Sequence, residues 1–313
     1  METRRRSLAA LAALAVTALA GCAGTTPAAT PATSAAGSAS AAAATINVVA
    51  STNVWGDIAG QIGGSQVAVT SIIDNPDADP HEYQASSRNQ LALSQAQVVI
   101  ENGGGYDDFV DTMLQASGNT SATVLNAVDI SGHKAAAGEE LNEHVWYDYA
   151  TVAKVAGELK DAFSAASPSE ASTFEANTST FLSGLDALNG TVADLKKKDA
   201  GKGAAITEPM PVYLLEAMGL VNKTPDEFSE AIENDTDVPA KVLAETLALF
   251  SDHDVAVLAY NSQTTGPQTE KVLAAAKAAN VPVVPVQETL PAGTSYLEWQ
   301  GGIVDALGQA LAQ

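Results

Sequence analysis

Short apolar runs alternate with amphipathic stretches along most of this chain. In the first half, these runs have the length and the valine and isoleucine content of buried strands. The predicted strands are residues 46–50, 67–73, 98–100 and 123–125. The stretches between them place apolar side chains three or four positions apart, which predicts helices. Strands separated by helices form βαβ units, so this half predicts a mainly parallel sheet flanked by helices.

A second series of the same kind follows. Its predicted strands and helices are 204–207, 212–218, 238–250, 255–260, 269–279, 281–286 and 295–311. Between the two series, apolar positions repeat at helical spacing from Ser169 to Lys198, after Pro168 ends the preceding helix. We expect an N-terminal α/β lobe (46–168), a long bridging helix (169–199) and a C-terminal α/β lobe (200–313). A long helix packed along one domain is the alternative.

The first residues have the pattern of an export signal. Three arginines precede an alanine-rich apolar run that is too short to span a bilayer and that ends at Cys22. We expect residues 1–21 to be a lipoprotein signal peptide, with Cys22 lipidated. Residues 22–45 hold mainly Ala, Thr, Ser, Pro and Gly, which predicts a disordered linker. The protein is therefore expected outside the cytoplasm, anchored to the bacterial cell membrane.

The folded part is strongly acidic. The whole chain has a formal net charge of −22, and without residues 1–21, whose net charge is +2, the charge is −24. Phosphates would be repelled, so nucleic acid is excluded as a partner. An acidic surface is compatible with cation handling, although diffuse charge usually marks only a solvated surface. Cys22 is the only cysteine, so no intramolecular disulfide can form.

Two histidines lie in segments rich in carboxylates and aromatic residues. His81 is in residues 79–83 (DPHEY), and His144 is in residues 142–148 (NEHVWYD). Glu208 and Glu288 follow predicted strands of the second series, and ligands of open parallel sheets bind at the carboxyl ends of strands. We expect these four side chains to converge between the lobes as a nitrogen and oxygen ligand set for Zn²⁺ or Mn²⁺.

Two further residues are expected beside this site. Asp148 is predicted to orient an imidazole through its second nitrogen. Asn261 follows a strand and either reaches the site or forms a turn. His133 and His253 have no supporting context and are interpreted as surface residues.

Two other classes of protein also use histidine and carboxylate ligands. One is an exported metal-dependent hydrolase, and the other is a surface adhesin with a structural metal. The chain has no HExxH helix, no G-x-S-x-G elbow and no cysteine left for nucleophilic chemistry, which disfavours an enzyme.

Around the four expected ligands, the chain resembles the zinc/manganese solute-binding proteins of bacterial ABC importers. The segments 79–83 and 142–148 are similar to the first two ligand motifs of that family, and residues 207–214 (TEPMPVYL) and 287–290 (QETL) to the third and fourth. The resemblance implies two α/β lobes joined by a long helix. It also implies capture of a divalent metal ion and its delivery to a membrane permease, with no enzymatic activity. We expect a monomer.

The sequence departs from the zinc-type members of that family. Glu208 stands where zinc-type members often carry histidine, Glu288 stands where aspartate is usual, and no long histidine-rich loop is present. These departures favour manganese slightly. Zinc stays open, because it binds most nitrogen and oxygen sites more tightly than Mn²⁺.

Overall fold

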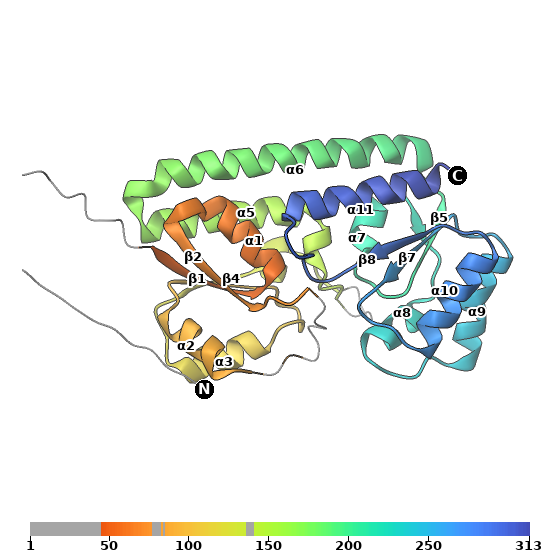
Figure 1. Cartoon of the computed structure of the whole chain (residues 1–313), viewed down its shortest axis with the longest axis horizontal. Helices are drawn as coiled ribbons and strands as arrows, with labels where there is room; N and C mark the ends of the chain where they lie inside the picture. The colour runs from red at the N-terminus through yellow and green to blue at the C-terminus, as the bar shows by residue number, and fades with distance from the viewer. Residues whose placement is uncertain (1–44, 77–82, 84, 136–140) are drawn as a thin grey trace, which may run out of the picture. The chain divides into compact units, whose positions relative to one another are not determined.

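The computed structural model describes residues 45–76, 83, 85–135 and 141–313, which belong to one compact unit (Figure 1). The predicted signal peptide, Cys22, most of the predicted linker and the predicted ligand His81 lie outside the described residues. Within the described part, no helix is both long enough and apolar enough to cross a membrane.

Two parallel sheets of four strands form the centre of the two lobes. The first sheet has the order β2-β1-β3-β4, and the second has the order β6-β5-β7-β8, so the two sheets share one topology. The strands are β1 (Ile46–Thr52), β2 (Val67–Ile73), β3 (Val98–Glu101), β4 (Thr123–Asn126), β5 (Gly203–Ile206), β6 (Val221–Asn222), β7 (Val257–Asn261) and β8 (Val283–Val286). This arrangement confirms the predicted fold class.

The helices of the first lobe are close to those predicted. They are α1 (Asn53–Gly63), α2 (Ser87–Gln95), α3 (Phe109–Ser117), α4 (Ala127–Ser131) and α5 (Tyr149–Ala166), with the short 3₁₀ helix η3 (Val145–Tyr147) just before α5. Helix α4, a single turn, was not predicted. Ser86 begins α2 because its hydroxyl accepts a hydrogen bond from the backbone N–H of Asn89. Asp148 begins α5 in the same way.

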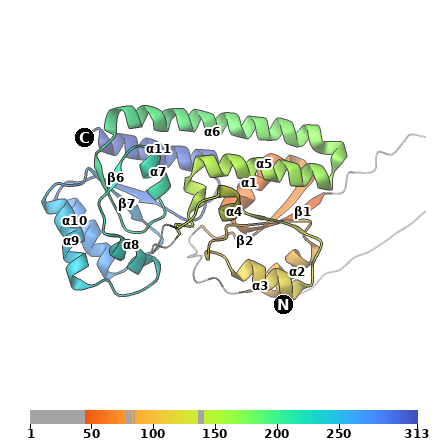
Figure 2. The same cartoon turned by 180° about the vertical axis from the view of Figure 1, so that it is seen from behind.

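The long helix is α6 (Ala171–Asp199), as predicted except that its first residues form a separate 3₁₀ turn. Its apolar stripe, from Phe174 to Val192, is buried, and its last turn carries Lys196, Lys197 and Lys198, where cations favour the helix dipole. It packs against α1 and α5 of the first lobe and against α11 (Tyr296–Leu311) of the second (Figure 1, Figure 2). This packing confirms the bridging helix.

The second lobe holds two elements that the sequence pattern did not predict, β6 and α8 (Asp226–Glu233). Its other helices are α7 (Val212–Ala217), α9 (Ala240–Ser251) and α10 (Pro267–Ala278). Helix α8 was missed because it has only two large apolar side chains, Phe228 and Ile232, both of which are buried. That spacing of four, after Pro225 and two acidic first-turn residues, is a helix signal.

Each sheet is covered on both faces. One continuous apolar core joins the inner faces of the two sheets through α1, α5, α6 and α11, and it includes Trp55, Phe163 and Leu307. Separate clusters lie on the outer faces, one beneath α2 and α3 and the other beneath α8, α9 and α10. Because residues on both sides of the strands are apolar, the strands read as continuous apolar runs rather than as alternating patterns.

Candidate metal centre

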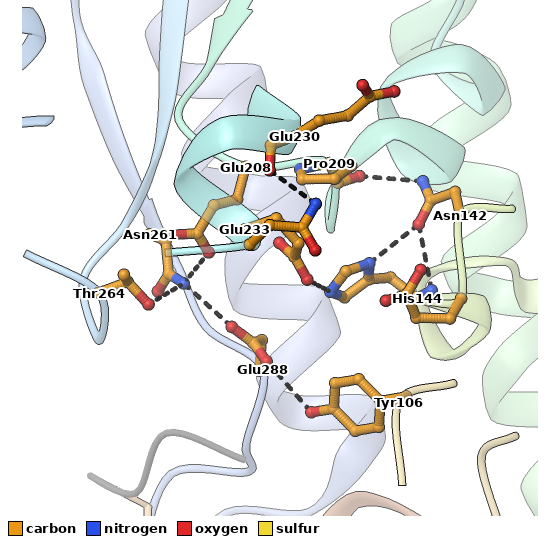
Figure 3. Close-up of polar contacts among 12 residues, drawn as sticks. Tyr106, Asn142, His144, Glu208, Pro209, Glu230, Glu233, Asn261, Thr264 and Glu288 are labelled. Carbon is orange, nitrogen blue, oxygen red and sulfur yellow. Dashed lines mark hydrogen bonds and ion pairs between the residues drawn. The ribbon is translucent and has the colours of Figure 1, made fainter. Parts of the chain in front are cut away.

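His144 lies at the start of η3, completely buried. The rings of Tyr106 and Trp146 are 5.9 and 5.0 Å from its imidazole, measured between ring centroids. Its Nδ1 is 2.9 Å from Oδ1 of Asn142, and its Nε2 is 3.3 Å from Oε1 of Glu233 (Figure 3). The amide of Asn142 therefore fixes the ring so that Nε2 faces the second lobe.

The surroundings of His144 favour a positive charge on its ring. Burial, the largest single effect, lowers the pKa of the imidazole, but Glu233 and the other nearby carboxylates together more than compensate, and the pKa rises to about 9. Glu143 and Glu288 act in the same direction. The carboxylates around Nε2 thus stabilise positive charge at this position, and the same carboxylates would stabilise a metal ion bound there.

The two predicted carboxylates of the second lobe lie close together. Glu208 follows β5 and Glu288 follows β8, and both are almost completely buried. Nδ2 of Asn261, at the end of β7, donates hydrogen bonds to Oε2 of Glu208 and to Oε1 of Glu288, the latter at 3.1 Å (Figure 3). The structure thus places Asn261 beside both carboxylates. Its Oδ1 also accepts from the backbone N–H of Gln263, as in an Asx turn.

Burial and mutual repulsion act on these carboxylates. Burial raises the pKa of Glu208 first, and the negative charges of Glu288 and Glu233 raise it further, to about 8. In the part of the chain that the structure describes, Oε1 of Glu208 is buried and has no hydrogen-bond partner. Burying such an atom without a partner is costly. A bound cation would offset the repulsion between the carboxylates and would give Oε1 a partner.

Tyr106 connects the first lobe to this group of carboxylates. Its hydroxyl donates a hydrogen bond of 3.2 Å to Oε2 of Glu288 (Figure 3). The ring follows three consecutive glycines with positive φ, and a side chain at the first of them, Gly103, would collide with Asn126. The Gly-rich segment is therefore a tight turn.

Glu233 is the residue of this site that the sequence analysis missed. It is the last residue of α8, and its side chain is 9 % exposed. Possible ligand atoms of Glu143, His144 and Glu233 all lie within 4.8 Å of one another. The helix signal at Pro225 would have located α8, but nothing local indicated that its last residue meets His144.

Asp148 contacts the imidazole of His133. Its carboxylate lies 2.9 Å from Nε2 of His133 and also bonds Thr151 and the N-terminus of α5, and it does not hold the ring of His144. Asn142 holds that ring instead, because the turn before η3 points its amide back at the imidazole. His133 is partly exposed and stacks on Tyr213. His253 is exposed.

Comparison with known proteins identifies the family of this chain. The family described as zinc-uptake complex component A, periplasmic, matches residues 48–310. The manganese-binding lipoprotein MntA of Bacillus subtilis is 31 % identical over 147 residues, which are 46 % of this chain and 48 % of MntA. That match therefore spans about half the length of the curated relative.

Solved structures show the same fold. A crystal structure of ZnuA superposes with a TM-score of 0.70 at 17 % identity, covering 86 % of this chain and 98 % of ZnuA. A manganese-bound mutant of a periplasmic metal binding protein from Candidatus Liberibacter asiaticus gives a TM-score of 0.67 at 17 % identity, covering 84 % and 98 % of the two chains. The match over residues 48–310 and the shared two-lobe fold show that the chain belongs to the extracytoplasmic, metal-binding solute-binding proteins of ABC transporters, which are not enzymes.

Proposed function

We propose that this protein captures one Mn²⁺ or Zn²⁺ ion with His144, Glu208 and Glu288 as ligands. The observation that supports this most directly is the burial of all three side chains, with Asn261 bonded to both carboxylates and Oε1 of Glu208 without a hydrogen-bond partner among the described residues. His81, which lies outside the described residues, stays the fourth predicted ligand. Asn261 is proposed to fix the separation of the two carboxylates.

We propose manganese as the preferred metal. The proposed ligands offer nitrogen and oxygen atoms but no sulfur. A site with carboxylate oxygens suits harder ions such as Mn²⁺ better than a site built from imidazoles alone. The similarity to a manganese-binding lipoprotein supports this choice. The family description names zinc uptake, so both ions belong in every binding experiment.

We further propose that the protein is a monomer anchored by lipid on Cys22 and that it delivers its ion to a membrane permease. The apolar run before Cys22 and the lipoprotein name of MntA support the anchor. Membership of an ABC transporter family supports the delivery step. A lipid anchor would hold the binding protein within reach of its transporter.

Calorimetry of the purified chain with Mn²⁺ and with Zn²⁺ tests the binding proposal. We expect one ion per chain, and a rise in melting temperature, since a ligand at 100 times its Kd stabilises the fold by about 2.7 kcal/mol. His144→Ala should abolish both effects. His253→Ala, at an exposed position away from the site, is the matched control and should bind as the unmodified chain does. Equal binding by both variants would refute the site.

A further inference from the structure

Helix α8 ends against the imidazole that the proposed site uses. The geometry points to Glu233 as a further metal ligand, supplied by the C-terminal end of α8. This inference rests on the proposed function and adds a third carboxylate to the site. The sequence motifs did not indicate it, because α8 itself was not predicted.

The first support is the distance between Glu233 and His144. Two neighbouring ligands of one metal ion, each about 2.0–2.2 Å from it, lie roughly 2.8–3.6 Å apart in octahedral or tetrahedral geometry. Oε1 of Glu233 and Nε2 of His144 are 3.3 Å apart (Figure 3). The two atoms therefore already have the separation that a shared ion requires.

The orientation of the imidazole is the second support. Nδ1 of His144 faces Oδ1 of Asn142 at 2.9 Å, which leaves Nε2 as the nitrogen available to a metal. Metal-binding histidines usually have their other nitrogen held in this way by an oxygen atom. Nε2 points at Glu233, so the direction in which His144 would bind an ion is also the direction in which Glu233 lies.

The third support comes from the other side of the site. Glu233 is close enough to Glu208 for its charge to raise the pKa of that carboxyl group, after the larger effects of burial and Glu288. Oε1 of Glu208 is buried without a hydrogen-bond partner in the described part of the chain. Figure 3 shows Glu233 between Asn261 and His144. The charge of Glu233 therefore acts on two of the proposed ligands, His144 and Glu208.

Open space borders this position. Glu143, Glu230 and Glu233 contribute to the lining of a cavity of about 520 Å³. Glu233 therefore lines the cavity and also contacts His144. A hydrated cation is small enough to enter such a space, and the carboxylate of Glu233 would be among the first buried groups to replace its water.

A third carboxylate changes which ion the site prefers. Each added oxygen ligand with negative charge favours the harder Mn²⁺, which accepts more ligands than the four that zinc usually takes. Loss of Glu233 should therefore weaken Mn²⁺ binding more than Zn²⁺ binding. This difference distinguishes a ligand from a group that only adds negative charge nearby.

Glu233→Gln in the full chain tests the inference, because glutamine keeps the size and removes the charge. The matched control is Glu230→Gln, which lies on the same helix and lines the same cavity. We expect Glu233→Gln to weaken Mn²⁺ binding at least about tenfold, since even residues that merely support a ligand change affinity by 10–100-fold. Glu230→Gln should stay within about twofold of the unmodified chain.

Electron paramagnetic resonance of bound Mn²⁺ gives a second readout. We expect the zero-field splitting to change clearly in Glu233→Gln and little in Glu230→Gln, because a direct ligand affects the symmetry around the ion far more than a residue outside the coordination shell. Melting curves of the metal-free variants check that both fold. Unchanged or stronger Mn²⁺ binding by Glu233→Gln, while His144→Ala removes binding, would overturn this inference and leave the proposed function standing. Failure of the unmodified chain to bind either ion would overturn the proposed function itself.

Discussion

The two lobes have the same strand order but bring different chemistry to the site. In the first lobe, an imidazole is packed against the rings of Tyr106 and Trp146. The second lobe contributes carboxylates tied together by one amide, that of Asn261. Topology thus decides where strand ends lie, whereas the residues just beyond the strands decide what those ends can bind.

The lobes also differ in how directly their sheets position these side chains. Asn261 is the last residue of β7 and pairs with Val286 of β8, two residues before Glu288. The register of the second sheet therefore sets the position of its carboxylates. His144 lies on a 3₁₀ turn beyond its sheet, and Asn142 sets the orientation of its ring. The first lobe depends more on side-chain contacts than on strand register.

The largest effect is expected from the second lobe. Glu208→Gln should lower Mn²⁺ affinity by at least about a hundredfold, because it removes a charged ligand whose loss should exceed the 10–100-fold typical of supporting residues. Calorimetry against Glu216→Gln, an exposed residue on α7 that lines the cavity, gives the control. An equal loss in Glu216→Gln would mean that overall charge, and not ligation, controls affinity.

In the first lobe we expect the next largest effect at Asn142. Asn142→Ala removes the oxygen that orients His144 and the hydrogen bond of 3.0 Å from its Nδ2 to the carbonyl of Pro209. Metal affinity should fall about 10–100-fold. Asp148→Asn is the control, since it keeps a capping oxygen on α5 and leaves His144 unaffected. If Asp148→Asn weakened binding as much, orientation of His144 by Asn142 would not explain the loss.

Glu101 is a buried carboxylate of the first lobe, and its effect on stability can be compared with that of Glu208 in the second lobe. It ends β3, accepts a hydrogen bond from Asn126, and has a pKa raised by burial to about 7. The folded chain binds this proton more tightly than the unfolded chain, so stability should fall by roughly 2–3 kcal/mol as the pH rises from about 4.5 to 7. Urea unfolding of metal-free Glu101→Gln should lack this contribution.

The control for Glu101 is Asp186→Asn, an exposed carboxylate on α6, which should keep the pH dependence of the unmodified chain. Metal loading should leave the contribution of Glu101 unchanged, because its hydrogen-bond partner belongs to its own lobe. A pH dependence that survives in Glu101→Gln would place the responsible group elsewhere, with Glu208 the first candidate.

The smallest effect is expected where the lobes touch. Tyr106→Phe removes the hydroxyl that donates to Glu288 and should cost about 1 kcal/mol of metal binding, roughly fivefold in affinity. Tyr149→Phe is the control, since it loses a hydrogen bond of 3.0 Å to Gln300 instead. If both variants bound the metal as the unmodified chain does, the contact between Tyr106 and Glu288 would have no part in binding.

The sequence predicted most of the scaffold because the signals for it are local. Apolar runs such as 98–100 mark strands, and the long apolar stripe between Phe174 and Val192 marks α6. The rule that ligands gather at strand ends also pointed to Glu208 and Glu288, which both contact Asn261. Helix α8 was missed because it has only two turns and few apolar residues.

The choice of neighbours for His144 came only from the tertiary structure. Sequence proximity pointed to Asp148, but the backbone turn before η3 directs Asn142 at the ring and Asp148 at His133. The approach of Glu233 depends on how the end of α8 packs against the first lobe, and no local pattern encodes such a contact. Periodicity therefore determined the elements and the strand ends, whereas long-range packing determined which side chains share one buried site.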